Sequence, residues 1–164
     1  MTLRILRPIL GLGACLQAAC FFQSETPLGS AKEGILETAF FGTWHCVSPK
    51  DSGDTATLLL AAFDEKQYFV EWTERDDVSH YRMYSTKVGQ ERVLNAQPLA
   101  SQPDNTAWVF LKLRIGGDGR LVVDMVDEDA MKGLKGKKAL AEIKRRVADP
   151  TLFSRFADCS REEG

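Results

Sequence analysis

The chain has 164 residues, of which 44% are hydrophobic and 27% are charged, and its formal net charge is −2. This balance is typical of a single globular domain rather than of a disordered chain. A net charge so close to zero argues against a nucleic-acid-binding protein that relies on bulk electrostatic attraction. We therefore expect one folded domain that does not bind nucleic acid.

The N-terminal segment is laid out like a secretory leader. Arg4 and Arg7 lie within a stretch that contains no acidic residue, and residues 8–22 then carry no charge at all. A basic start followed by a short apolar run is typical of a signal peptide. The run is shorter than the about 20 apolar residues of a membrane-spanning helix. We expect residues 1–19 to be a leader.

Two cysteines near the end of this run each follow small residues. The stretches Leu-Gly-Ala-Cys at 12–15 and Leu-Gln-Ala-Ala-Cys at 16–20 resemble the lipobox of bacterial lipoproteins. The resemblance implies that one cysteine is acylated and becomes the new N-terminus once the leader is removed. It also implies a lipid anchor in the inner or outer membrane of a bacterial envelope, with the domain in the periplasm. A plain cleaved leader or an uncut N-terminal anchor is the alternative.

The number of cysteines favours Cys20 over Cys15 as the acylated residue. Cys15 has the better local motif, because Leu12 stands at the third position before it, whereas Cys20 follows a longer apolar run. Cleavage before Cys20 removes Cys15 and leaves Cys46 and Cys159 as an even pair in an oxidising compartment. We predict acylation at Cys20, with Cys15 as the alternative, and a disulfide between Cys46 and Cys159.

Residues 20–41 are expected to connect the lipid to the folded domain. Residues 23–34 are polar and contain two glycines and a proline, a composition that is typical of a tether. The single folded domain is then expected over residues 42–164.

From Gly42 onward the hydrophobic pattern has the period of two that is typical of β-strands. Turn-forming residues separate the runs, and Gly-Gly-Asp-Gly at 116–119 is a strong hairpin signal. Because the connections are short, sequential antiparallel pairing is expected. The seven predicted strands lie at about 42–47, 56–63, 68–73, 81–86, 93–99, 108–115 and 121–125.

The last forty residues are predicted to be helical. One apolar stripe at helical spacing consists of Leu140, Ile143 and Val147. Asp149 and Pro150 suit the N-cap and first position of a second short helix, with Phe156 on its apolar face. The expected fold is mainly β, a seven-stranded antiparallel meander or small barrel closed by a C-terminal helical segment.

The first predicted strand carries a further resemblance. Gly-Thr-Trp at 42–44 is similar to the Gly-x-Trp of lipocalin-like barrels, which also end in a helix. The resemblance covers these three residues, implies a barrel, and carries over no binding residue.

No arrangement of residues points to catalysis, a metal ion or a cofactor, so we name no catalytic residue, metal ligand or cofactor and leave open whether the protein is an enzyme. His45 and Cys46 are neighbours on a predicted strand, where side chains point to opposite faces, so the histidine is not placed to activate the thiol. His45 and His80 lack the short spacing of a two-histidine metal site. The acids Asp124 and 127–129 lack the spacing and glycine of a calcium loop, and we expect residues 127–129 at a strand end and a helix start.

The most asymmetric charge lies in residues 132–146, where seven basic residues accompany one acid. Two interpretations remain open for Lys137, Lys138, Lys144 and Arg145. They contact anionic lipid headgroups, at about 1 kcal/mol per base, or they form a solvated helix face.

Together these features predict an envelope lipoprotein that acts as a non-enzymatic binding module. Its expected partners are the membrane, through the N-terminal lipid, and an apolar ligand, an envelope polymer or an envelope protein. The alternative is an envelope-anchored hydrolase whose site the sequence does not reveal. A barrel with a cavity would favour a small ligand, whereas a filled core would favour binding at the surface.

Overall fold

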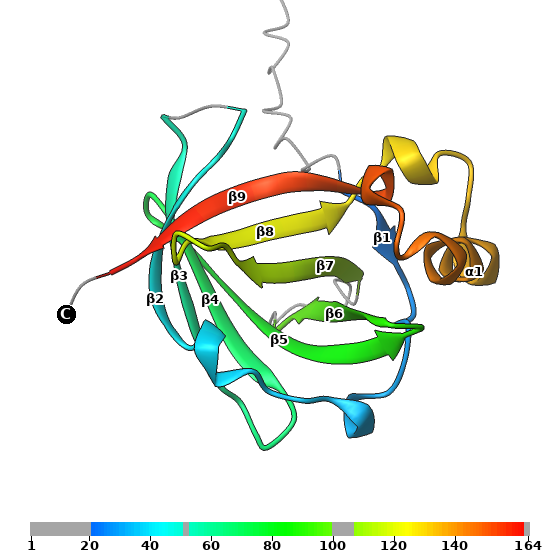
Figure 1. The fold of residues 1–164 in the computed structure, drawn as a ribbon, viewed down its shortest axis with the longest axis horizontal. Coiled ribbons are helices and arrows are strands. Elements are labelled where there is room, and N and C mark those ends of the chain that lie inside the picture. Colours follow the sequence, from blue (N-terminus) through cyan, green and yellow to red (C-terminus); the bar gives the residue numbers. More distant parts are fainter. Residues whose placement is uncertain (1–20, 51–52, 100–106, 163–164) are drawn as a thin grey trace, which may run out of the picture.

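The computed structural model of the chain describes residues 21–50, 53–99 and 107–162, and their fold is mainly β (Figure 1). The strands are β1 (Gln23–Ser24), β2 (Gly42–Val47), β3 (Thr55–Ala62), β4 (Tyr68–Glu74), β5 (Asp77–Val88), β6 (Glu91–Pro98), β7 (Trp108–Ile115), β8 (Leu121–Val126) and β9 (Phe153–Arg161). The helix α1 (Gly136–Arg146) and the short 3-10 turns η1 (Ala31–Glu33), η2 (Thr38–Phe40), η3 (Asp129–Met131) and η4 (Pro150–Leu152) complete the described elements.

Strands β2 to β9 form a closed antiparallel barrel. The hydrogen-bonded order is β7-β6-β5-β4-β3-β2-β9-β8, and β8 pairs with β7 to complete a ring of eight strands. The seven predicted strands correspond to β2 through β8. These strands could be recognised in the sequence because each keeps a regular alternation of inward and outward side chains. The prediction of a mainly β antiparallel fold is confirmed, but its strand count is wrong by the strand that closes the ring.

The missing strand is β9, where the sequence predicts a short helix. Asp149 does cap a turn, and its side chain accepts a hydrogen bond from the backbone N–H of Thr151, but that turn is only η4. The register against β8 then shifts at a bulge that leaves Phe156 unpaired. An extra residue inverts the alternation of a strand, so Phe153 packs in an outer core and Cys159 in the inner one. The bulge therefore hides the period of two in the sequence.

Strand β9 carries one half of the predicted disulfide. Cys46 of β2 and Cys159 of β9 are directly paired in the sheet, with a Cα–Cα distance of 3.9 Å and an S–S distance of 2.00 Å. The predicted pair is confirmed, although Cys159 lies on a strand and not on a helix. Both side chains are buried in the inner core.

One end of the barrel is filled by Trp44, which is fully buried. Its indole N–H donates a hydrogen bond to the carbonyl of Phe40 at 2.9 Å, and the Arg161 guanidinium lies 4.1 Å from the centre of its ring. Arg161 also donates a hydrogen bond to the carbonyl of Phe41 at 2.7 Å. Gly42 has a φ of +126°, and a Cβ there would lie 2.7 Å from the Arg161 guanidinium, so a side chain does not fit. We call this the closed end.

The helix α1 lies against the outside of the barrel (Figure 1). Ile143 and Val147 of the predicted apolar stripe are buried, and Leu140 is half-buried against the same cluster. They pack with Trp108 and Phe110, which alternate with the inward residues of β7. The predicted helix is therefore present, but the prediction that a helical segment closes the barrel is wrong, because β9 does so.

The N-terminal segment, predicted as a tether, is packed against the barrel. β1 pairs with β7 where β7 and β8 diverge, and the backbone N–H of Phe22 donates to the carbonyl of Val126 at 3.2 Å. Phe22 and Leu28 are both buried in the outer core. In the sequence, Phe22 reads as the end of the N-terminal apolar run, and Leu28 is a single large apolar residue among polar neighbours. The structure therefore does not contain the tether predicted over residues 23–34.

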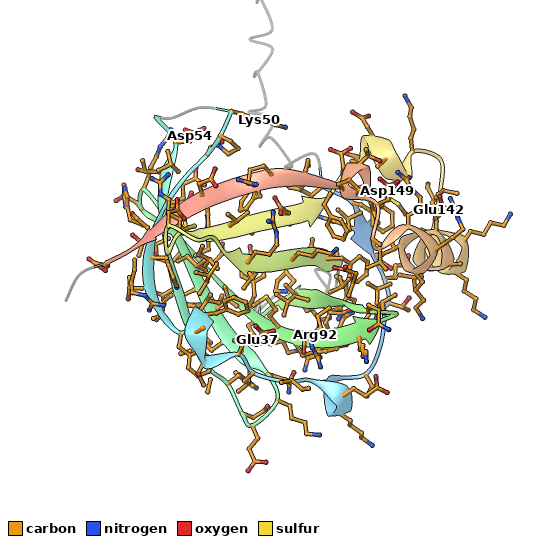
Figure 2. All side chains as sticks on the ribbon, viewed as in Figure 1. Glu37, Lys50, Asp54, Arg92, Glu142 and Asp149 are labelled. Carbon is orange, nitrogen blue, oxygen red and sulfur yellow. A yellow bond between two sulfur atoms is a disulfide. The ribbon has the colours of Figure 1, made fainter. Side chains whose placement is uncertain are left out.

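Side chains of the barrel hold the rest of this segment. The buried amide oxygen of Asn95 accepts a hydrogen bond from the backbone N–H of Leu28 at 2.8 Å. The hydroxyl of Tyr68 accepts one from the backbone N–H of Glu37, labelled in Figure 2, at 2.6 Å. The segment from Phe22 to η2 is thus fixed to the barrel along its length.

Candidate functional site

The barrel encloses an apolar cavity of about 290 Å³. Its wall is built from the inward-facing residues of successive strands, such as Leu58 on β3, Val70 on β4, Met83 on β5, Val109 on β7 and Val123 on β8. Alternation along each strand places these side chains inside and their neighbours outside. Among the described residues the wall contains no charged side chain. Such a surface suits an apolar ligand.

The cavity opens at the end of the barrel opposite Trp44, which we call the mouth. The strands alternate in direction, so the β2–β3, β4–β5, β6–β7 and β8–β9 connections share this end. An ion pair of 3.6 Å between Arg75 and Asp54 joins two of these connections. Lys50 and Asp54, labelled in Figure 2, mark the β2–β3 connection.

Three aromatic rings border the mouth. The ring centres of Phe21 and Phe156 are 5.2 Å apart and edge-to-face, and those of Phe156 and Trp72 are also 5.2 Å apart. All three residues line the cavity and are only partly buried. Trp44 fills the closed end, whereas these three rings border the open cavity. A ligand can therefore enter at the mouth but not at the closed end.

Apolar side chains are also exposed beside the mouth. Leu99, directly after β6, is 39% exposed, and its backbone N–H donates a hydrogen bond to the carbonyl of His80 on β5 at 2.8 Å. Val78, near the start of β5, is 52% exposed. At the closed end, Ile115 is exposed to the same extent as Leu99, at 39%.

A second, wider groove adjoins the mouth. It measures about 840 Å³ and lies between residues 21–25 and residues 128–136. It shares Phe21 and Gln23 with the apolar cavity, and its charged lining residues have both signs: Lys132 and Lys135 with Glu25, Glu128 and Asp129. An apolar cavity and a groove of mixed charge therefore meet along one short segment of chain.

The basic region predicted from the sequence divides into free and paired side chains. Five lysines are exposed, and their side chains make no hydrogen bond or ion pair with any described residue; we call these the basic surface: Lys132, Lys135, Lys137, Lys138 and Lys144. Arg145 is exposed but paired with Glu142 at 2.6 Å, and its hydrogen bond lowers the pKa of that carboxyl. The predicted contact residues Lys137, Lys138 and Lys144 are therefore available to a partner.

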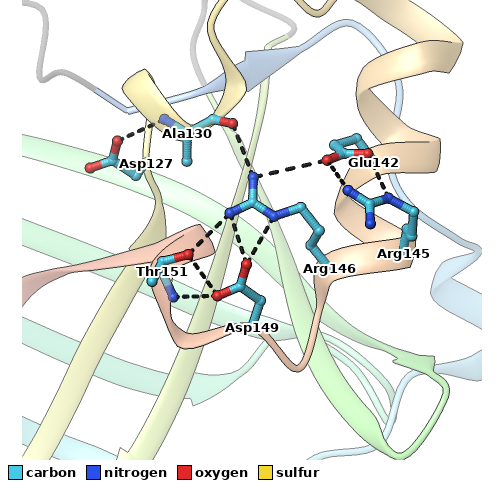
Figure 3. Close-up of polar contacts among 7 residues, drawn as sticks. All are labelled: Asp127, Ala130, Glu142, Arg145, Arg146, Asp149 and Thr151. Carbon is cyan, nitrogen blue, oxygen red and sulfur yellow. Dashed lines mark hydrogen bonds and ion pairs between the residues drawn. The ribbon is translucent and has the colours of Figure 1, made fainter.

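Arg146 is committed to the fold (Figure 3). It pairs with Asp149 at 2.9 Å and donates hydrogen bonds to the Thr151 hydroxyl at 3.1 Å and to the carbonyl of Ala130 at 3.3 Å. Hydrogen bonds from the hydroxyl and backbone N–H of Thr151, and then from Arg146, lower the pKa of Asp149 to about 2. The network fixes the end of α1 to η3 and η4.

The acidic residues considered as cation ligands have other partners. Asp124 lies between Arg114 and Arg155. Partial burial acts to raise the pKa of Asp124, but hydrogen bonds from the two guanidinium groups outweigh it and leave the pKa below its usual value. Asp127 accepts a hydrogen bond from the backbone N–H of Ala130 at 3.1 Å. Within the described ranges, no group of three or more potential metal ligands occurs.

The two histidines lie apart. The side chain of His45 is exposed and that of Cys46 is buried in the disulfide, as expected for neighbours on a strand. His80 contacts the Glu71 carboxylate at 2.9 Å on the outside of the barrel. Neither histidine lines the cavity.

Sequence reasoning missed the mouth. Phe21 directly follows the predicted acylation site Cys20, where it reads as the end of the apolar run, and Phe156 is the bulge residue of an unrecognised strand. The sequence offers no signal for the mouth beyond the size of these two aromatic residues, and it assigns Phe156 to the apolar face of a predicted helix. The predicted acylation sites, Cys20 and Cys15, lie outside the described residues.

No family model, no curated protein and no solved structure matches this chain. Among the described residues, no helix has both the length and the apolar character needed to cross a membrane.

Proposed function

We propose that the chain is a lipid-anchored binding module of the bacterial envelope that holds an apolar ligand inside its barrel. The observation that carries the proposal is the apolar cavity of about 290 Å³ that opens at the mouth. It exceeds the roughly 150 Å³ of an engineered cavity that binds benzene, and it is close to the lower limit of about 300 Å³ for ligand pockets. The ligand is accordingly slim, such as one alkyl chain.

Burial of an alkyl chain supplies enough free energy for such binding. Each buried methylene group contributes about 0.8 kcal/mol, so about eight of them contribute roughly 6 kcal/mol before the cost of association is subtracted. A wall without charged side chains favours this ligand, because a polar group placed there without a partner would cost free energy.

The location in the envelope rests on two features of the chain. The leader and lipobox-like cysteines support export and acylation at Cys20. The disulfide between Cys46 and Cys159 supports an oxidising compartment such as the periplasm, because disulfides are rare in the cytosol. No specific observation among the described residues favours the alternative of a hydrolase.

Displacement of a dye tests ligand binding. The leaderless chain retains all described residues and both cores, and it is titrated with N-phenyl-1-naphthylamine and then with medium-chain fatty acids. We expect dye fluorescence to rise on binding and to fall as the fatty acid displaces the dye. Absence of saturable dye binding to the folded protein would reject the proposed function.

Two adjacent valines of β8 provide a matched pair of variants. Val123 lines the cavity, whereas Val122 pairs with Arg114 of β7 and Asp158 of β9 on the other face. We expect Val123→Phe to weaken dye binding at least tenfold and Val122→Phe to leave it unchanged. If Val123→Phe does not fold, Leu111→Ala enlarges the same cavity and is expected to admit bulkier dyes.

Membrane fractionation tests the anchor. We expect Cys20→Ala to move the protein from the membrane fraction to the soluble fraction and Cys15→Ala to leave it membrane-bound. The reverse result would assign the lipid to Cys15. Retention of both variants in the membrane would reject the lipoprotein proposal.

A further inference from the structure

The outward face of α1 is basic along its whole length. Ile143 and Val147 are buried against the barrel, so the opposite side of the helix faces solvent. The exposed residues on that side are Lys137, Lys138, Ala141, Lys144, Arg145 and Ala148. Glu142, the one acid of α1, is paired with Arg145. The face therefore presents three lysines without a partner among the described residues, around two alanines and with no large apolar side chain.

The positive charge is concentrated on α1 and not in the neighbouring groove. The groove contains Lys132 and Lys135 but also the three acids Glu25, Glu128 and Asp129. Charges of opposite sign that lie close together largely cancel each other's field at a distance. An anionic partner is therefore attracted to the outward face of α1 and not to the groove.

The chain enters the fold beside α1. Phe21 forms an isolated bridge with Asp127, directly after β8. The side chain of Phe22 packs in the same outer core as Ile143 of α1. Figure 1 shows β1, which follows at once, next to α1. A lipid on Cys20, one residue before Phe21, is therefore attached on the side of the barrel that carries α1.

Little slack separates this attachment point from the barrel. A free tether of about 12 residues, as the sequence predicts, would reach about 40 Å and would let the domain turn in any direction above the bilayer. Instead, Phe22 and Leu28 are buried, and the amide oxygen of Asn95 accepts a hydrogen bond from the backbone N–H of Leu28 at 2.8 Å. The packed segment thus keeps the α1 side of the barrel toward the bilayer that holds the lipid.

An anionic bilayer is the partner that fits this face and this attachment point. We infer that the outward face of α1 rests on an anionic membrane surface, with Lys137, Lys138 and Lys144 against the headgroups, and that this contact orients the barrel on the membrane. The contact is electrostatic, because the large apolar side chains of α1 are already used in the outer core and none is left to insert. The anchor favours a bilayer over an acidic protein, since it brings a bilayer to this side in any case. The inference rests on the envelope location in the proposed function and not on the ligand of the cavity.

Sedimentation with vesicles tests the charge contact in the absence of the lipid anchor. The leaderless chain is mixed at low ionic strength with vesicles of phosphatidylcholine alone or of phosphatidylcholine and phosphatidylglycerol in equal parts. We expect binding only to the anionic vesicles, and we expect added salt to weaken it, because salt screens exposed charges.

Two double variants locate the contact. Lys137→Glu/Lys144→Glu should weaken binding to the anionic vesicles at least tenfold. Lys50→Glu/Lys66→Glu makes the same change of charge at exposed positions of the β2–β3 and β3–β4 connections, and it should change binding less than twofold.

Three results would overturn the inference. The first is an absence of binding to anionic vesicles at low ionic strength, and the second is an equal loss in the two double variants. The third is retention of the leaderless chain on immobilised polyglutamate without binding to vesicles, because this would assign the face to an acidic protein.

Fluorescence quenching at two exposed alanines tests the orientation. Ala141 lies in the middle of the outward face of α1, and Ala62 is the last residue of β3. The acylated protein carries Ala141→Cys or Ala62→Cys, labelled with a fluorophore, on anionic vesicles that contain a lipid with a nitroxide on its headgroup. We expect quenching at position 141 to be at least threefold stronger than at position 62. Equal quenching, or stronger quenching at position 62, would overturn the orientation.

These outcomes are distinguishable from a failure of the proposed ligand. Saturable binding of the naphthylamine dye by a leaderless chain that does not bind anionic vesicles rejects the membrane contact of α1 and leaves the proposed function intact. Binding to the vesicles without binding of the dye rejects the apolar ligand and leaves the contact of α1 in place.

Discussion

Each end of the barrel has a tryptophan, but the two side chains have different surroundings. At the closed end Trp44 is fully buried, its N–H has an acceptor, and the Arg161 guanidinium covers its ring. At the mouth Trp72 is half-buried and packs on Phe156, with the cavity behind it. The closed end contributes more to stability because its side chains are fully packed. The mouth is suited to binding because its side chains border an unfilled cavity.

The largest expected effect comes from removing the side chain that fills the closed end. Trp44→Ala should lower the free energy of unfolding by about 3–5 kcal/mol, the usual range for a buried aromatic residue. Trp72→Ala should cost less than about 2 kcal/mol, because its side chain is only partly buried and borders the cavity. Urea denaturation measures both variants. Equal losses would contradict the division of roles between the two ends.

The disulfide between Cys46 and Cys159 should have the next largest effect. It joins residues separated by 113 positions, and removal of such a cross-link typically costs about 2–4 kcal/mol. Cys46→Ala/Cys159→Ala should therefore lower the melting temperature, while dye binding at the mouth is retained below the new transition. A loss of dye binding in the folded variant would show that the cross-link also maintains the cavity.

A smaller, pH-dependent effect is expected at the junction of α1 with the barrel. Asp149 has a pKa of about 2 in the folded protein, against an ordinary value of 3.8. A carboxyl with a lowered folded pKa contributes stability above its unfolded pKa and loses that contribution as the pH falls through the folded one. The stability difference between the unsubstituted chain and Asp149→Asn should therefore be constant above about pH 5 and shrink toward pH 2. A difference that does not change over this range would contradict the assignment.

The smallest stability effects should come from two exposed apolar residues at opposite ends of the barrel. Leu99→Ser and Ile115→Ser should each change the free energy of unfolding by no more than about 0.5 kcal/mol, because both side chains are 39% exposed and neither is in a core. Urea denaturation measures both variants. A larger loss at either position would show that its side chain contributes to a core.

Most of the barrel could be predicted from the sequence because β2 to β8 keep a regular alternation. Strand β9 could not, because the bulge at Phe156 inverts the alternation halfway along. The packed N-terminal segment was hidden for a different reason, since Phe22 reads as the end of the N-terminal apolar run and Leu28 is a single large apolar residue in polar surroundings. The pairing of Cys46 with Cys159 depends on cysteine number and compartment, so it could be predicted without the correct secondary structure.

The candidate site was less predictable than the fold. A cavity depends on the volume that the inward side chains leave unfilled, and this volume cannot be predicted from the pattern of residues in the sequence. The mouth brings together Phe21, Trp72 and Phe156 from three distant parts of the chain. The lysines were visible as a charge cluster, but only the contacts of Arg145 and Arg146 separate paired from unpaired side chains.

The position of β9 also sets a requirement for folding. This strand fills the gap between β2 and β8, so both of those strands keep an unpaired edge until the last residues of the chain arrive. Unpaired edges invite pairing with other chains, and contacts between the two ends of a sequence form slowly because a long loop must close first. A chain whose residues 153–161 are not yet available cannot complete its barrel, and it is vulnerable to aggregation until these residues pair with β2 and β8.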